Sequence, residues 1–156
     1  MKPTRVVEPW AAPPLGRFVA ESAARLVLLM SPSGQVFAQH GFTRAVDVMS
    51  AAALGAGIVA STGEMARMVE EPSFAALNHQ GAHHGIFLGS FTLPRGPMLA
   101  LVVYGPDSSV GLVQLFFEEL VRDLVQSAPA PAPARPALAA DFENDLNESL
   151  ATLFRT

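Results

Sequence analysis

Residues 46–71, VDVMSAAALGAGIVASTGEMARMVEE, decide the fold predicted for this chain. Asp47 is placed to cap the start of a helix, because a carboxylate there accepts hydrogen bonds from unpaired backbone N–H groups. Pro72 removes a backbone donor and predicts the end of the helix near Glu71. The stretch therefore predicts one long helix over residues 47–71.

This predicted helix has two unlike faces, because successive residues turn by about 100° around the axis. One face is expected to be ordinary core and carries Leu54, Ile58, Ser61, Met65, Met68 and Val69. The other begins with small residues and ends with charges: Ala53, Ala56, Gly57, Ala60, Glu64, Arg67 and Glu71. Glycines at 55, 57 and 63 each cost a helix about 1 kcal/mol against alanine. Their presence favours close packing, either in the chain's own core or against another helix or protein.

The composition fits one domain with a short appendage and excludes several classes of function. The 156 residues are half hydrophobic, with a net charge of −4, one lysine and scattered arginines, so nucleic-acid binding is not expected. The absence of cysteine fits a cytosolic protein and is compatible with other compartments. The first residues lack the apolar run of a signal peptide. Residues 48–63 are uncharged but fall short of the ~20 apolar residues of a membrane span.

The remaining elements follow from apolar runs between turn signals. Strands are predicted at residues 25–30, 35–40, 74–80, 84–93 and 98–104, and helices at 17–24 and from Ser108 or Ser109 to Gln126. The order α-β-β-α-β-β-β-α predicts an α/β (α+β) sandwich. Its five-stranded, mainly antiparallel sheet would carry the long helix on one face and two helices on the other.

Four segments make up the predicted domain organisation. An irregular N-terminal arm covers residues 1–16, where Trp10 is expected to pin the arm to the surface, and the folded domain covers 17–127. A Pro/Ala linker covers 128–137 and is expected to be extended. An amphipathic helix covers 138–156. It is too short to be stable alone in water, so it is expected to dock on a partner, to remain a solvated acidic tail or to fold back on its own domain.

The chain resembles the roadblock/dynein light chain family over about residues 18–126. The resemblance rests on the order and spacing of short motifs: the 26–30 strand with its SPSG turn, AAALGAG at 51–57, AST at 60–62, EMA at 64–66, HQG at 79–81, LALVVY at 99–104 and SVGLV at 109–113. Within this family it is similar to the bacterial MglB proteins, which regulate the Ras-like GTPase MglA. Three positions depart from the usual family residues: Glu64, Gln80 and Gln114.

The resemblance implies a homodimer or heterodimer in which the long helices pack antiparallel and the strand at about 74–80 pairs with its mate. The implied dimer residues are Ala56, Phe74, Ala76, Asn78 and Gln80. The implied surface for a small GTPase comprises Ala53, Gly57, Ala60, Glu64 and Arg67. The implied GTPase anchors on the C-terminal helix are Phe142, Leu146, Leu150, Leu153 and Phe154.

The function implied is a cytoplasmic, homodimeric regulator of an MglA-like GTPase, located at a cell pole. It would stimulate GTP hydrolysis through the long helices and assist nucleotide exchange through the C-terminal helix. Arg67 is the arginine on the proposed face, yet a surface pair with Glu64 or Glu71 is its expected role. Holding the GTPase's own switch residues in place is the expected mechanism, and this requires tighter binding of the GTP-bound form.

Two other functions stay open. A scaffold in a polarity or motility complex would bind its partner equally in both nucleotide states. A small-ligand sensor is opposed by the Ala/Gly face, which offers no polar pocket.

An enzyme with its own catalytic site is not expected, because no catalytic triad or phosphate loop stands out. No cofactor is predicted. His79, His83 and His84 lack the spacing and the nearby carboxylates of a metal site, and pH sensitivity is the role considered for them.

Overall fold

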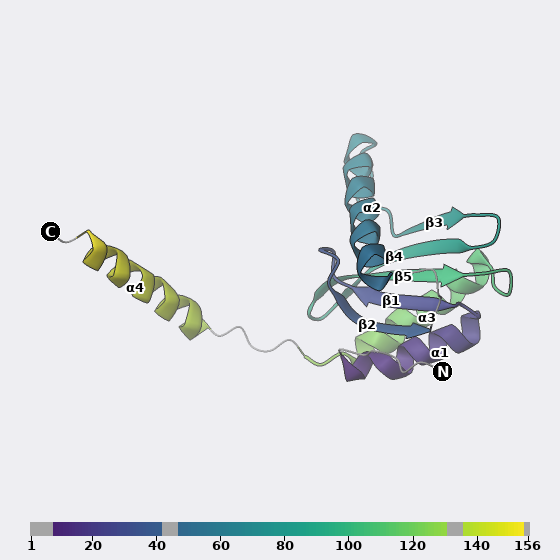
Figure 1. Ribbon diagram of the computed structural model, residues 1–156, viewed down its shortest axis with the longest axis horizontal. Helices are drawn as coiled ribbons and strands as arrows, with labels where there is room; N and C mark the ends of the chain where they lie inside the picture. The colour runs from purple at the N-terminus through teal and green to yellow at the C-terminus, as the bar shows by residue number, and fades with distance from the viewer. Residues whose placement is uncertain (1–7, 42–46, 131–135, 155–156) are drawn as a thin grey trace.

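A single antiparallel sheet organises the domain (Figure 1). The computed structural model describes residues 8–41, 47–130 and 136–154, without the side chains of 136–143. The strands are β1 (Leu26–Met30), β2 (Val36–Gly41), β3 (Ala76–Gln80), β4 (Gly85–Leu93) and β5 (Gly96–Tyr104). Their order across the sheet is β2-β1-β5-β4-β3, and every neighbouring pair is antiparallel. The predicted five-stranded sheet is confirmed, with β2 and β3 at its edges.

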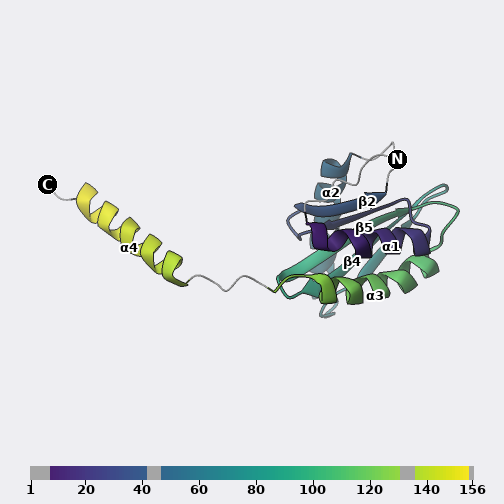
Figure 2. The same cartoon turned by 90° about the horizontal axis from the view of Figure 1, so that it is seen from below.

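Helices cover both faces of the sheet, as Figure 2 shows. Helix α2 (Val48–Met68) lies on one face, whereas α1 (Ala12–Ser22) and α3 (Val110–Ser127) lie on the other. Two hydrophobic clusters result, one on each face. β1 is buried along its whole length, since Val27 and Leu29 enter the α1/α3 cluster and Leu28 and Met30 enter the α2 cluster. A strand covered on both faces reads as a continuous apolar run, which explains its sequence. The predicted layer arrangement is confirmed.

Helix α1 starts earlier than predicted. It begins at Ala12, directly after a short 3-10 helix, η1 (Pro9–Ala11). Pro13 and Pro14 therefore lie in its first turn, where a missing N–H breaks no helical hydrogen bond. The predicted irregular arm is therefore wrong for residues 9–16, which are helical. Residues 1–7 of that arm lie outside the described residues.

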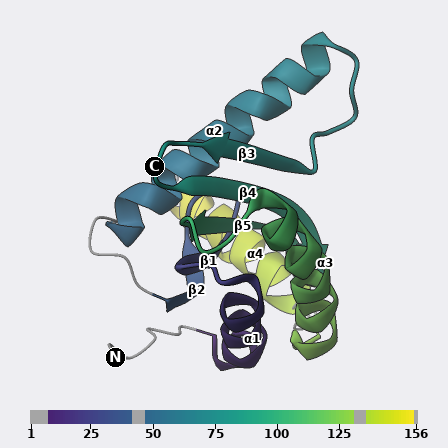
Figure 3. The same ribbon diagram turned by 90° about the vertical axis from the view of Figure 1, so that its right-hand side faces the viewer.

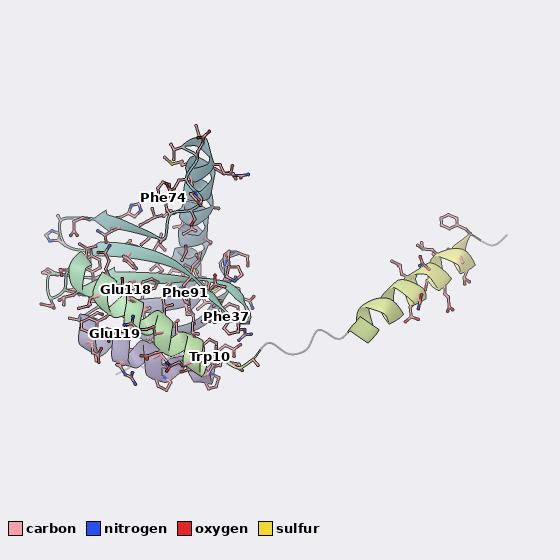
Figure 4. All side chains as sticks on the ribbon, turned by 180° about the vertical axis from the view of Figure 1, so that it is seen from behind. Trp10, Phe37, Phe74, Phe91, Glu118 and Glu119 are labelled. Carbon is pink, nitrogen blue, oxygen red and sulfur yellow. The ribbon has the colours of Figure 1, made fainter. Side chains whose placement is uncertain are left out.

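Trp10 fixes this N-terminal segment to the sheet, as predicted. The indole Nε1 donates to Glu8 at 3.0 Å, and Glu8 forms an ion pair with Arg95 at 3.3 Å. The Arg95 guanidinium lies 5.9 Å from the centre of the Trp10 ring and 5.4 Å from that of Phe37. Trp10 and Phe37 come together near the end of α3 in Figure 4. A cation between two rings ties the β4–β5 turn to the N-terminal segment.

The face of α2 that meets the sheet is not the one predicted. Ala52, Gly55, Ala56 and Ala66 are buried, whereas the predicted core residues are exposed: Leu54 at 69%, Ile58 at 37%, Met65 at 63%, Met68 at 83% and Val69 at 68%. Ser61 is exposed as well. The reason is steric. A Cβ at Gly55 would lie 3.0 Å from Leu101 Cδ1 and 3.1 Å from Met30 Cε. The large side chains of the sheet therefore leave no room for a larger residue at Gly55.

The ends of α2 follow local rules. The Asp47 carboxylate accepts hydrogen bonds from the amide of Met49 at 3.1 Å and from the hydroxyl of Ser50 at 2.7 Å, which confirms the predicted cap. The hydrogen bond from Ser50 lowers the pKa of Asp47, because it stabilises the charged carboxylate. The helix ends at Met68, three residues before the predicted end, and Glu70 has a φ of 57°.

Helix α4 (Pro136–Leu153) is the last element. Figures 1 and 2 both draw it away from the sheet and its helices. Its last residues expose an apolar set: Leu146 at 48%, Leu150 at 43%, Leu153 at 78% and Phe154 at 83%. The side chain of Phe142 lies outside the described residues. An amphipathic helix with an exposed apolar set has the form of a docking element.

Candidate partner-binding surface

The outward side of α2 carries a strip of large apolar side chains, which we term the apolar strip: Leu54, Ile58, Met65, Met68 and Val69. Large exposed apolar patches mark sites where another protein binds. Ile86 of β4 is also exposed, at 39%. All five residues of the apolar strip belong to the face of the helix that was predicted to be core, and that prediction is wrong. The signal that identifies the true core face is the group of small residues at 52, 55 and 56, which pack against the sheet.

Beside the apolar strip lies the predicted GTPase-binding face of α2. All five of its residues are exposed: Ala53, Gly57, Ala60, Glu64 and Arg67. A Cβ at Gly57 or Gly63 would meet no atom within 4 Å, so the backbone is open to close approach there. Arg67 donates to Glu64, which is the expected surface pair. The guanidinium is therefore already engaged in the free chain.

Strand β3 is an open edge of the sheet beside α2. Figure 3 shows α2 extending past this edge. Ala76, Asn78 and Gln80 are exposed, and Phe74 just before the strand is 44% exposed. An edge strand offers unpaired backbone groups to another strand. Ala56, predicted at the dimer interface, is instead 8% exposed and packs in the α2 cluster against its own sheet.

Tyr104 supports the β3 edge from within. Its hydroxyl lies 2.8 Å from Asn78 Oδ1 and 3.0 Å from Gln80 Oε1, and it donates its single proton to one of them at a time. A Cβ at Gly85 would lie 2.1 Å from Tyr104 Cζ, so the ring packs directly on the β4 backbone. Two of the predicted dimer residues are thus held in place by a buried side chain.

An apolar groove of about 400 Å³ lies between the second half of α2 and the sheet. Its lining comes from α2, from strands β3 to β5 and from the segment before β3, and includes Val59, Gly63, Phe74, Leu77, Met98 and Leu99. Phe74 lies beside α2 in Figure 4. Gly63 leaves the side next to the helix open. We call this cavity the α2 groove.

The histidines near β3 form no metal site within the described residues. No group of three or more His, Asp or Glu side chains there is close enough to hold a metal ion. Arg25 Nη1 lies 2.8 Å from His84 Nε2, a hydrogen bond in which the imidazole accepts.

By length and mean hydropathy alone, α2 could cross a membrane, with 21 residues and a value of 1.2. Glu64 and Arg67 lie on the helix, and Ala52, Gly55 and Ala56 pack against the sheet. Through these contacts α2 forms one layer of the sandwich.

Known structures similar to this chain share its fold. A roadblock/LC7 domain from Streptomyces avermitilis is 15% identical, with a TM-score of 0.60, and the match covers 71% of this chain and 91% of that one. Neither a protein-family model nor a curated protein matches the sequence. The domain therefore has the roadblock fold, as the sequence motifs predicted.

Within that fold, the chain is similar to MglB. Myxococcus xanthus MglB is 25% identical, with a TM-score of 0.68, and the match covers 76% of this chain and 86% of that one. The gliding protein MglB of Thermus thermophilus is 24% identical, with a TM-score of 0.68, over 82% of this chain and 98% of that one. The predicted resemblance to MglB is confirmed at the level of structure.

Proposed function

We propose that this protein is a dimeric regulator of a Ras-like small GTPase of the MglA type, without a catalytic site of its own. The observation that carries the proposal is the exposure of both outward sides of α2 in a chain whose structure is similar to MglB. A 21-residue helix with two exposed sides has room for a dimer contact on one and a GTPase on the other.

The dimer forms through the apolar strip and β3. Burying the strip against the α2 helix of a second copy removes large apolar side chains from water. Pairing β3 with the partner's β3 satisfies the edge and joins two sheets into one. Phe74, Ala76, Asn78 and Gln80 contribute to this contact, whereas Ala56 acts only within its own chain.

The GTPase binds the side formed by Ala53, Gly57, Ala60, Glu64 and Arg67. An inserted arginine can speed phosphoryl transfer by roughly 10³–10⁵. Arg67 is paired with Glu64, so this route is not the one we assign. The protein acts by binding the GTP-bound form more tightly and holding the GTPase's own catalytic residues in place. Such a shift is limited by the difference in affinity for the two nucleotide states.

Helix α4 is a second GTPase-binding element that assists nucleotide exchange. Its apolar residues, Leu146, Leu150, Leu153 and Phe154 together with Phe142, form the anchors. The protein works in the cytoplasm, at the cell pole where its GTPase gathers.

The test is GTP turnover by the host's MglA-like GTPase with and without the full chain, and with residues 1–127. We expect acceleration that survives the truncation, together with tighter binding of the GTP form. Glu64→Lys should reduce the acceleration, whereas Glu118→Lys, at an equally exposed class of position on α3, is the matched control. No acceleration, with equal binding of GTP and GDP forms, would overturn the regulator and leave a scaffold.

A further inference from the structure

The α2 groove and helix α4 are two apolar features of one chain that have no partner within its described residues. The groove is lined mainly by apolar side chains, and α4 exposes Leu146, Leu150 and Leu153. These three leucines recur at spacings of four and three residues, so they lie along one side of the helix. We infer that α4 docks its leucine side into the α2 groove of its own chain when no GTPase is bound. The effect of this docking on GTPase binding rests on the proposed function, whereas the test of the docking itself does not.

To dock, the chain must pass from the face of the sheet that carries α3 to the face that carries α2 and its groove. Helix α3 starts just after β5 and runs 18 residues, about 27 Å, back along the sheet. Figure 1 shows it ending on the side where the β4–β5 turn lies, and Thr92, Pro97 and Met98 around that turn line the groove. Eight residues separate Ser127 from Pro136. At about 3.1 Å per residue for a Pro-rich segment, they span about 25 Å.

The groove also suits the occupant in shape and charge. Gly63 leaves the helix side of the groove without a side chain, so an incoming helix meets no obstruction there. The lining has no charged residue, whereas Asp145 and Glu148 of α4 are exposed on the helix beside its leucines. The apolar side of α4 therefore enters the groove, and the carboxylates stay in water.

When α4 is docked, it covers part of the proposed GTPase-binding face of α2. Gly63 lines the groove and precedes Glu64, a member of the proposed GTPase-binding face. A helix seated in the groove lies against that face and limits access to it. A GTPase that binds the face displaces α4, which is then free to reach its second site. The same segment thus restrains the regulator before the GTPase arrives and holds the GTPase afterwards.

The absence of cysteine allows a direct test on the full chain. A paramagnetic label attached to Ser149→Cys is expected to weaken the amide signals of Val59, Gly63 and Ser90 and to leave those of α1 unchanged. A second variant carries Thr92→Glu, which places a carboxylate in the groove against acidic α4. We expect it to restore the signals, whereas the uncharged Thr92→Gln should not.

Signals that stay intact in the labelled chain, or a Thr92→Glu variant that behaves like Thr92→Gln, would overturn the docking. A mixture of labelled unenriched chains and unlabelled enriched chains tests the same-chain assignment. Weakening that appears in this mixture as strongly as within one chain would overturn it. No GTPase is present in these experiments. Loss of GTPase acceleration with intact docking therefore refutes only the proposed function, and the converse result refutes only the docking.

Discussion

Leu54→Ala tests whether the apolar strip stabilises the proposed dimer. The substitution removes three carbons, each worth about 0.8 kcal/mol when fully buried. Scaled by the 69% of Leu54 that is exposed in the single chain, the loss is about 1.7 kcal/mol per copy. Both copies contribute, so the dimer loses about 3 kcal/mol, which weakens the dissociation constant roughly a hundredfold. The folded single chain changes little, because the side chain is exposed there.

Sedimentation equilibrium over a range of concentrations gives the dissociation constant of each variant. Leu115→Ala is the matched control, since Leu115 is 54% exposed on α3, on the opposite face of the sheet. We expect the control to dimerise like the unchanged protein. If Leu54→Ala dimerises as tightly as the control, the apolar strip is not the dimer contact and the reasoning from its exposure fails.

Three further sets of substitutions test other parts of the argument. Because the pKa of Asp47 lies below its ordinary 3.8 in the folded chain, its stabilisation is present above that value and is lost as pH falls through the folded pKa. Asp47→Asn keeps a helix cap but has no titratable carboxyl. The midpoint of thermal unfolding of this variant should therefore lack the pH dependence that Asp47 contributes between roughly pH 2 and pH 5. Gly63→Ala should raise stability by about 1 kcal/mol, and Gly57→Ala should do the same while weakening GTPase binding; equal binding would argue against close approach at that face. Tyr104→Phe should cost about 1 kcal/mol and speed amide exchange in β3, and unchanged exchange would show that the hydroxyl does not hold the edge.

The topology could be predicted because each element has a local signal. The SPSG turn, the capping residues Asp47 and Ser109, and the turn before β5 all mark boundaries that tertiary packing did not move by more than a few residues. The order of elements then left few ways to build a sandwich, because sequential antiparallel strands pair with short connections.

The orientation of α2 could not be predicted in the same way. Helical periodicity says which residues share a face, but it does not say which face the sheet accepts. That choice depends on Met30, Leu88 and Leu101, which come from three different strands and together fill the space beneath Gly55. The cluster of Trp10, Glu8 and Arg95 was hidden for the same reason, since Arg95 lies far along the chain from the other two.

The two edges of the sheet differ in how well each could accept a strand from another copy of the chain. At β2, the backbone oxygen of Phe37 accepts a hydrogen bond from the amide of Glu8, and Gly41 ends the strand with a φ of 88°. The N-terminal segment thus occupies a backbone acceptor that another strand would need. At β3, no such cover exists within the described residues, and the strand is short and polar at Asn78, His79 and Gln80. Strand addition at a single edge is self-limiting, because pairing two copies consumes both available edges and leaves no template for a fibre.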